Sequence, residues 1–142
     1  VHYPYLFGCD PAAGHMMLYG GPAGTRRWSV SANPTIVDDP NLVDPDAWHF
    51  VLGVYEPSVR VTLWTTSQGG LAKVAETTSG VPASKPAITA HYLGNDVRED
   101  HPVAAVAYAG VIVAAVADVD VPGIYSRVRA ALASRSTPVV LP

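Results

Sequence analysis

The sequence has very little cysteine and lysine, which limits how the fold can be stabilised and what it can bind. Cys9 is the only cysteine of the 142 residues, so no internal disulfide can form. We expect Cys9 to be a small, buried apolar side chain. The nine basic residues are scattered, apart from the Arg26-Arg27 pair, and the formal net charge is −3. A chain without a basic cluster is not expected to bind nucleic acid.

Charged residues and long apolar segments are also scarce. Charged residues make up 15% of the chain and hydrophobic residues 49%, a balance that favours a folded core over disorder. The longest apolar run, residues 103–117, falls short of the roughly 20 residues that a membrane span needs, so no membrane insertion is expected. A chain of 142 residues can bury a sufficient core without disulfides or metals. We therefore expect a single domain over residues 1–142.

Short apolar stretches separated by turn residues indicate β-strands. The chain contains 13 Pro and 12 Gly together with many Val and Thr residues. The alternation is clearest at residues 59–66, where Val61 and Leu63 share one face and Arg60 and Trp64 the other. The expected strands are residues 3–7, 16–19, 27–31, 48–55, 59–66, 71–77 and 88–93, one or two within 103–119, and 137–141. Residues 33–45, rich in Pro, Asp and Asn, are expected to form a loop.

One helix is expected near the end of the chain. Ile124, Val128 and Leu132 recur at the spacing of one helix face. Asp120 is the expected N-cap, and Pro122 suits the first turn. About eight short strands and one short C-terminal helix predict an all-β sandwich or barrel.

Four segments follow one another in an order known from other proteins. Residues 46–55 (DAWHFVLGVY) match a W-H-x-V-x-G-x-Y strand, and residues 59–70 match a hairpin of the v-x-L-Y-x-x-G kind. Residues 88–95 match a strand ending in I-G-N, and residues 107–117 match an f-x-G-x-I strand before a short helix. Together these segments resemble laminin-G-like, concanavalin A-like domains. The resemblance implies an antiparallel jelly-roll sandwich.

The N-terminal part is shorter than this family usually has. Only 47 residues precede Trp48, so the first strands are expected to be missing, shortened or supplied by a neighbouring chain. An open sheet edge invites pairing with another chain, and we therefore expect a homo-oligomer.

The Ala/Val-rich, Asp-over-Lys composition resembles that of such modules in head and tail proteins of phages that infect high-GC bacteria. The resemblance implies a non-enzymatic structural or adhesive virion protein, either a capsid decoration or a minor tail component. Its partners would be other virion proteins, further copies of itself, or cell-surface glycan. The alternative is a carbohydrate-binding module of an extracellular bacterial protein.

Catalytic carboxylates are few. Hydrolases of the concanavalin A-like fold carry a Glu-x-Asp motif with a further Glu on one strand, and Glu56, Glu76 and Glu99 do not have that spacing. Asp118 and Asp120 share a strand face at i, i+2, but we favour Asp120 as a helix cap. The five histidines show no zinc-hydrolase spacing. We therefore expect no enzymatic activity.

A cluster of acidic residues in the 33–45 loop and just after it makes calcium a candidate ligand. Some relatives of the resembled family bind Ca²⁺ through loop aspartates, and oxygen ligands suit this ion. The candidate ligands are Asp38, Asp39, Asp44 and Asp46, with Asn41 between them. The spacing is not that of an EF-hand, and the intervening prolines favour ordinary turn formation instead. We expect no other cofactor.

Aromatic residues supply the candidate contact surface. Trp64 lies with Arg60 on the polar face of its strand, and Tyr92 lies in the strand at 88–93. An exposed Trp64 beside Arg60 and Tyr92 would form a platform for carbohydrate or protein. The alternative is that another sheet or subunit covers Trp64. Trp48 is expected to lie in the core.

Overall fold

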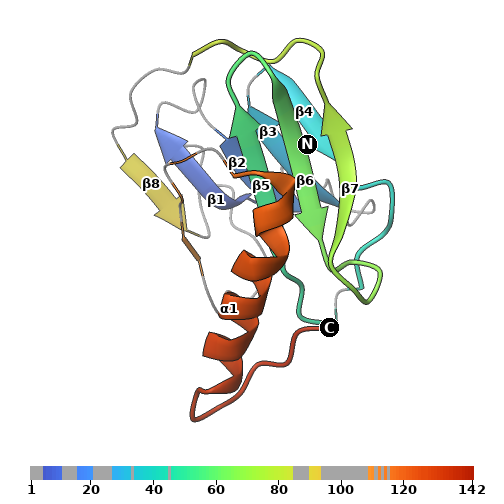
Figure 1. Ribbon diagram of the computed structural model, residues 1–142, viewed down its shortest axis with the longest axis vertical. Helices are drawn as coiled ribbons and strands as arrows, with labels where there is room; N and C mark the ends of the chain where they lie inside the picture. Colours follow the sequence, from blue (N-terminus) through green and yellow to red (C-terminus); the bar gives the residue numbers. More distant parts are fainter. Residues whose placement is uncertain are drawn as a thin grey trace.

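The chain forms two antiparallel sheets and one short C-terminal helix. The computed structural model describes residues 5–10, 16–20, 27–32, 34–44, 46–84, 90–93, 109–110, 112, 114 and 116–142, with 5–10, 16–20 and 90–93 described by their backbone alone. Sheet A has the strand order β4-β3-β2-β1-β8, and sheet B has the order β5-β6-β7 (Figure 1). This is the all-β class that the strand pattern predicts.

Every pair of neighbouring strands in these sheets is antiparallel. Sheet A contains β1 (Tyr5–Asp10), β2 (Met16–Gly20), β3 (Trp28–Ala32), β4 (Thr35–Asp38) and β8 (Ala90–Leu93). Sheet B contains β5 (Val51–Glu56), β6 (Arg60–Thr65) and β7 (Ala72–Thr77). A 3-10 turn, Asp118–Asp120, leads into α1 (Val121–Ala133).

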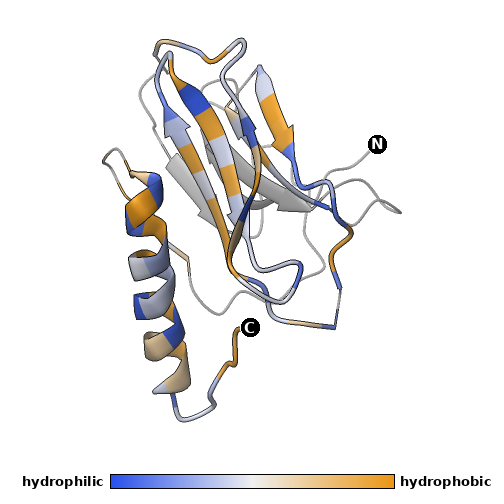
Figure 2. Ribbon diagram, turned by 45° about the vertical axis from the view of Figure 1, so that its right-hand side comes forward, coloured by the Kyte–Doolittle hydropathy of each residue, from blue (hydrophilic) through white to orange (hydrophobic). Residues whose placement is uncertain are grey.

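An apolar core lies between the two sheets. β3 contributes Val30 and Ala32, β4 contributes Val37, and β6 contributes Val61 and Leu63. Along β6 the core residues alternate with Arg60, Thr62 and Trp64, because successive side chains of a strand point to opposite faces. Figure 2 shows this alternation of hydrophobic and hydrophilic residues along the strands of sheet B.

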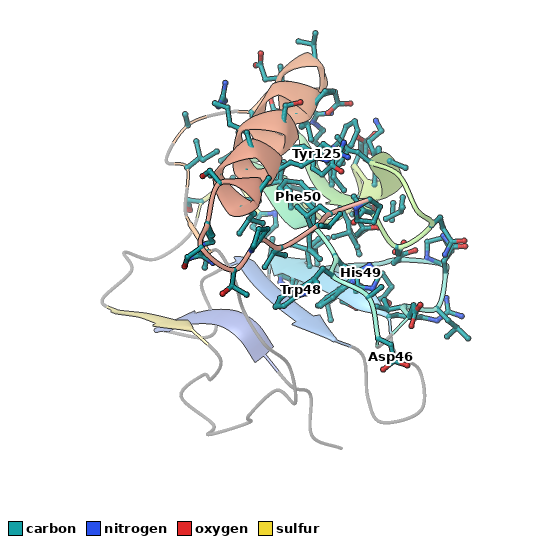
Figure 3. The ribbon with its side chains drawn as sticks, turned by 90° about the horizontal axis from the view of Figure 1, so that it is seen from below. Asp46, Trp48, His49, Phe50 and Tyr125 are labelled. Atoms are coloured by element: carbon teal, nitrogen blue, oxygen red, sulfur yellow. The ribbon has the colours of Figure 1, made fainter. Side chains whose placement is uncertain are left out.

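A second apolar layer lies between sheet B and α1. Phe50, immediately before β5, packs with Tyr125 and Leu132 of α1 and with Leu141. The rings of Phe50 and Tyr125 meet edge to face, with centroids 5.3 Å apart. After α1 the chain returns along the helix, and the Val139 amide donates to the Leu132 carbonyl over 3.3 Å. One face of sheet B therefore packs against sheet A, and the cluster around Phe50 packs α1 against one end of the other face (Figures 1 and 3).

The loop expected at residues 33–45 contains a strand that the sequence did not indicate. The residues Thr35, Ile36, Val37 and Asp38 of β4 pair with β3. Pro34 and Pro40 flank this strand, where their missing N–H groups interrupt no ladder. The loop prediction is therefore wrong for residues 35–38.

Two strand predictions near the C-terminus also differ from the structure. Most of the strand expected within 103–119 falls outside the described residues, and its end is wrong because Asp118–Asp120 form a 3-10 turn. The strand expected at 137–141 is not formed. Val139 and Leu141 instead pack in the cluster that contains α1 residues, and Leu141 is buried there.

The helix prediction is confirmed, but the predicted cap is not. α1 begins at Val121 with Pro122 in its first turn, and Asp120 occupies the N-cap position. The Asp120 side chain makes no capping hydrogen bond, because the preceding 3-10 turn already gives this residue helical backbone angles. No helix in the described part of the chain is long and apolar enough to cross a membrane.

The central position of Leu63 predicts a large effect of truncation. Leu63 is fully buried in the core between the sheets, so Leu63→Ala should lower the free energy of unfolding by about 2–5 kcal/mol. The matched control is Val59→Ala, because Val59 is exposed in the β5–β6 turn and should change stability by less than about 0.5 kcal/mol. Urea denaturation measures both, and equal effects would contradict the assigned core.

Candidate functional site

The segment that joins β4 to β5 carries the most exposed tryptophan of the described residues. This segment, which we call the Trp48 loop, spans residues 39–50, and all of it except residue 45 is described. It crosses from sheet A to sheet B at one end of the sandwich (Figure 1). Its position depends on two polar anchors, Asp39 at its start and His49 near its end.

Asp39 fixes the start of the Trp48 loop. Its carboxylate is fully buried and accepts four hydrogen bonds. Oδ1 accepts from the backbone N and from Nδ2 of Asn41, at 2.9 and 3.1 Å. Oδ2 accepts from Oγ1 of Thr65 at 3.1 Å and from Oγ of Ser67 at 2.7 Å. Because Thr65 ends β6, this one carboxylate ties the end of β4 in sheet A to the end of β6 in sheet B.

His49 fixes the other end of the loop. Nε2 lies 2.7 Å from the carbonyl oxygen of Asp44, and since a carbonyl can only accept, Nε2 carries the proton. The His49 ring meets Trp28 of β3 edge to face, with centroids 6.1 Å apart. The Asp46 amide donates to Oδ1 of Asp44 over 2.9 Å, which closes the turn before Trp48. The loop is thus held at several points rather than extended freely into solvent.

Trp48 is exposed, contrary to the expectation that it lies in the core. Its exposed fraction is 40%, and that of Leu42 in the same loop is 61%. β5 begins only at Val51, so Trp48 precedes the regular alternation of the strand, and Phe50 takes the buried place. Asp44 and Asp46 are exposed in the same loop, and Figure 3 shows Asp46 with Trp48 and His49. The loop therefore presents an aromatic ring together with carboxylates.

The residues expected to form the contact platform are separated by the fold. Trp64 and Arg60 share the outer face of sheet B, as the alternation of β6 predicts. Tyr92 lies in β8 of sheet A, where its backbone is opposite Gly8. Trp64 is half-buried rather than exposed, and its Nε1 is buried without a hydrogen-bond partner. A contact role for these residues stays a prediction, and so does the alternative that another sheet or subunit covers Trp64.

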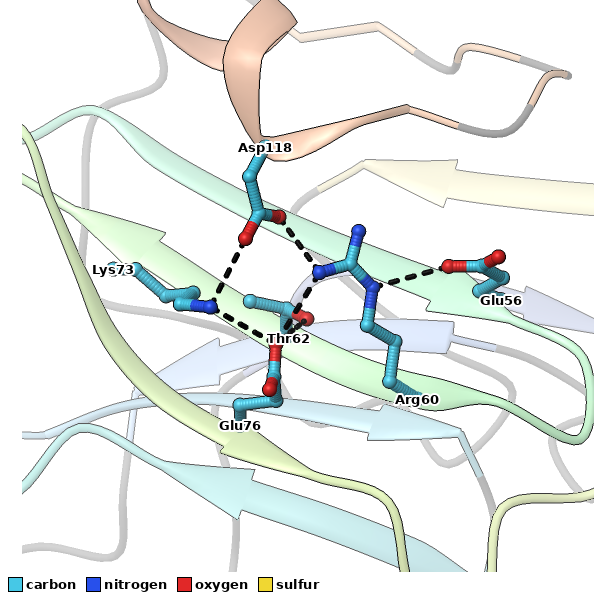
Figure 4. A network of polar contacts seen from close by, with 6 residues as sticks. All are labelled: Glu56, Arg60, Thr62, Lys73, Glu76 and Asp118. Carbon is cyan, nitrogen blue, oxygen red and sulfur yellow. Dashed lines mark hydrogen bonds and ion pairs between the residues drawn. The ribbon is translucent and has the colours of Figure 1, made fainter.

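Arg60 is the centre of an ion-pair network on the outer face of sheet B (Figure 4). Its Nε lies 3.0 Å from Oε2 of Glu56, and its Nη1 lies 3.3 Å from Oε2 of Glu76 and 2.8 Å from Oδ1 of Asp118. Lys73 joins the other side, with Nζ 3.1 Å from Oε2 of Glu76 and 3.0 Å from Oδ2 of Asp118. Three strands and the 3-10 turn are thereby linked through charge.

The network shifts the titration of its members. The hydrogen bond from Lys73 is the main cause that lowers the pKa of Asp118, and the Arg60 charge adds to it. The same lysine lowers the pKa of Glu76. In return, hydrogen bonds to Asp118 and Glu76 raise the pKa of Lys73. Asp118 is thus held ionised and paired, a state that does not suit a catalytic acid.

The aspartates proposed as calcium ligands have separate positions. Asp38 lies on β4 and accepts from the Ser29 hydroxyl, and Asp39 is enclosed by its four donors. Asp44 and Asp46 are exposed in the turn. Within the described ranges, no three His, Cys, Asp or Glu side chains are grouped as a metal site would require. The carboxylates of Asp39 and Asp44 each accept a hydrogen bond from the backbone N two residues ahead. These bonds form turns, which is the alternative that the sequence offered for this loop.

Asp39 is the site residue whose role the sequence analysis missed. Its carboxylate bonds the backbone N two residues ahead, the pattern of an Asx turn. The Asp-Pro-Asn sequence at residues 39–41 is a local signal that could have indicated this turn. The contacts with Thr65 and Ser67 could not have been found in the same way, because they join residues 26 and 28 positions apart.

Loss of the Asp39 carboxylate should destabilise the fold. Asp39→Ala would leave the buried Thr65 hydroxyl and the Asn41 amide without their acceptor, and we expect the free energy of unfolding to fall by about 2–4 kcal/mol. Asp46→Ala is the control, because this side chain is exposed and makes no hydrogen bond or ion pair with the described residues, so a change within about 0.5 kcal/mol is expected. Urea denaturation measures both. A calcium-dependent rise in the midpoint that Asp39→Ala abolishes would contradict this structural role.

The ion-pair network should make stability depend on acid pH. The pKa values of Glu76 and Asp118 lie below their ordinary values of 4.5 and 3.8, so the network stabilises the fold fully above those values. This contribution is lost as the pH falls through the lowered values, and the free energy of unfolding should decrease from about pH 5 downward. Urea denaturation across this range should show a smaller decrease for Asp118→Asn. The Asp120→Asn variant, with the same change of charge, should retain the wild-type decrease.

No protein-family model matches the chain, and no curated protein or solved structure matches it either. The likeness to laminin-G-like domains therefore rests on the sequence segments alone.

Proposed function

We propose that this protein is a non-enzymatic binding module that makes its contact through the Trp48 loop. The observation that carries the proposal is the exposure of Trp48. Its large aromatic ring faces solvent from a loop that Asp39 and His49 hold in place. A structural or adhesive role in a virion, as a capsid decoration or a minor tail component, is the setting that the sequence resemblance favours.

Trp48 suits an anchor residue because its side chain is large and because the loop that carries it is already fixed. A tryptophan side chain buries a large area when it is covered and has few rotamers to lose. The loop is already fixed by hydrogen bonds at both ends, so binding would order little additional chain. Residues of this kind are the ones that dominate the free energy of protein interfaces.

The contacts that the acidic side chains make support a function without catalysis. In the described part of the chain, Asp118 and Glu76 are engaged by cations, and Asp39 is buried among hydrogen-bond donors. A hydrolase needs a pair of carboxylates that are free to exchange protons and to attack a substrate. These three carboxylates are occupied in holding the fold together.

The β7 edge of sheet B is a poorer contact surface than the Trp48 loop. β7 is one of the two edge strands of sheet B among the described strands. Its register shifts at Val74, between the Leu63–Ala75 and Trp64–Lys73 pairs, and Lys73 lies on the edge. Bulges and lysines are features that discourage pairing with another chain. Self-association of this protein is therefore better served by the Trp48 loop than by the β7 edge.

Two stacked antiparallel sheets with a short helix after them also support the finer fold proposal, a concanavalin A-like jelly roll. The order of two of the segments that carry the resemblance supports it. Residues 51–56 and 60–65 form the β5–β6 hairpin, and the helix follows residues 107–117. We propose this topology for the chain.

The second candidate function is a carbohydrate-binding module. The observation that favours it is the position of Asp44 and Asp46 next to Trp48 in the loop. A sugar ring can stack on an indole, and carboxylates accept hydrogen bonds from its hydroxyl groups.

Substitution of Trp48 tests both candidates. Trp48→Ala should leave the unfolding midpoint nearly unchanged and weaken binding at least about tenfold, as expected for an exposed anchor residue. The measurements are the mass in solution by light scattering at several concentrations, and binding to a glycan array. Val59→Ala, at an exposed residue outside the loop, is the control.

The outcomes separate the two functions. A discrete oligomer that Trp48→Ala dissociates supports the structural protein, and a monomer with Trp48-dependent glycan binding supports the carbohydrate-binding module. If Trp48→Ala changes neither the mass nor any glycan signal, the Trp48 loop is not the contact surface.

A further inference from the structure

Two surfaces of this protein carry exposed charges that no group of the same chain neutralises. One is the Trp48 loop, where the carboxylates of Asp44 and Asp46 form no ion pair with the described residues. The other is α1, where Arg127 and Arg129 are exposed and form neither an ion pair nor a hydrogen bond with the described residues. The charges on the outer face of sheet B differ from these, because they are paired with one another.

Each of the two surfaces carries charge of one sign. The Trp48 loop contains no Lys or Arg, and residues 121–142, which are α1 and the chain after it, contain no Asp or Glu. Arg27 is a cation close to the start of the loop, but its Nη1 donates to the backbone carbonyls of Asp39 and Pro40 rather than to the exposed carboxylates. The chain therefore provides an acidic surface and a basic surface.

The outward face of α1 suits contact with a flat aromatic ring. α1 buries Tyr125 and Leu132, and at about 3.6 residues per turn the opposite side of the helix carries small residues. These exposed small residues are Gly123, Ser126 and Ala130. The same spacing puts Arg127 and Arg129 on the two flanks of this face. A β-carbon at Gly123 would lie 3.9 Å from Nη1 of Arg127, so this guanidinium lies along the helix surface.

The acidic loop and the basic helix face are not in contact within one chain. The loop ends at Phe50, whose ring meets Tyr125 on the buried side of α1. Figure 3 shows Asp46 on the far side of Phe50 from α1. Within the described part of the chain, neither surface has a counter-charge in contact with it, so each is open to a partner of opposite sign.

We propose that the Trp48 loop of one copy of this chain binds the outward face of α1 of a second copy. The indole of Trp48 lies against the small residues of the helix, and the two loop carboxylates pair with Arg127 and Arg129. A guanidinium also stacks on an aromatic face, so the arginines contact both the ring and the carboxylates. The inference rests on the proposed function of the Trp48 loop as the contact surface, and it names the partner.

Charge reversal on each surface, followed by light scattering at several concentrations, tests the proposal. The loop variant is Asp46→Lys, and the helix variant combines Arg127→Glu with Arg129→Glu. All three side chains are exposed and make no hydrogen bond with the described residues, so both variants should keep the wild-type unfolding midpoint. Each variant alone should raise the Kd of self-association at least about tenfold, because opposite charges become like charges.

The controls place the same charges elsewhere. Val59→Lys and Val59→Glu alter an exposed residue in the β5–β6 turn, outside both surfaces, and should leave the Kd unchanged. Because the contact is partly ionic, 1 M NaCl should weaken the association of the wild-type protein. An equal loss of association in the controls, or wild-type association in the helix variant, would overturn the proposal.

A mixture of the two variants tests whether the two surfaces bind each other. In an equimolar mixture, the unaltered loop of the helix variant meets the unaltered α1 of the loop variant, and the two altered surfaces are again opposite in charge. The mixture should therefore reach a mass of at least two chains at a concentration where each variant alone is a monomer. A mixture that stays monomeric would show that the loop and α1 are not partners.

The results also separate this inference from the proposed function. A wild-type oligomer that Trp48→Ala dissociates and the helix variant leaves intact keeps the Trp48 loop as the contact surface and overturns α1 as its partner. A monomer that binds glycan through Trp48 likewise overturns this inference alone. A monomer in which Trp48→Ala changes no binding overturns both.

Discussion

Strand β6 is largely buried on both of its faces, and the arrangement of the described residues depends on this constraint. β6 is the central strand of sheet B and turns Val61 and Leu63 toward sheet A, while Thr62 and Trp64 point to the opposite face. The remaining elements take their positions around this strand. Sheet A closes the inner face, the cluster of Phe50 with α1 and Leu141 packs at one end of the outer face, and the Trp48 loop connects the two sheets.

Polar contacts decide how the layers are aligned. Burial of apolar area is not directional, so it brings the layers together without fixing their register. Hydrogen bonds and ion pairs have defined geometry and can fix it. Asp39 does this between the two sheets, and Asp118 does it between sheet B and the 3-10 turn that precedes α1. The buried Asp39 is satisfied at both oxygens, whereas Asp118 is partly open to solvent, so the sheet-to-sheet contact is the firmer of the two.

The sequence alone predicted the local secondary structure, but it did not predict which side chains the rest of the fold buries. Alternation along β6 gave its two faces correctly, and helical spacing located α1. The two tryptophans show the limit. For Trp64 the sequence left exposure and cover by another sheet or subunit open, and in the fold this side chain is half-buried on the same face as the fully buried Thr62, which contacts Glu76. Trp48 was expected to be buried because its segment resembles a strand, but the strand begins three residues later. In both cases a partner distant in sequence, or the boundary of an element, decided the outcome.

The position of α1 near the end of the chain has a consequence for the order of folding. The β5–β6 and β6–β7 hairpins join residues close in sequence, and such local contacts form early. Asp118 meets Arg60 across 58 positions of the chain, so its contact must close a long loop. In a chain whose hairpins have formed before α1 packs, Phe50 and Leu52 would lack the apolar partners that cover them, and bare apolar side chains are what lets unfinished chains adhere to one another.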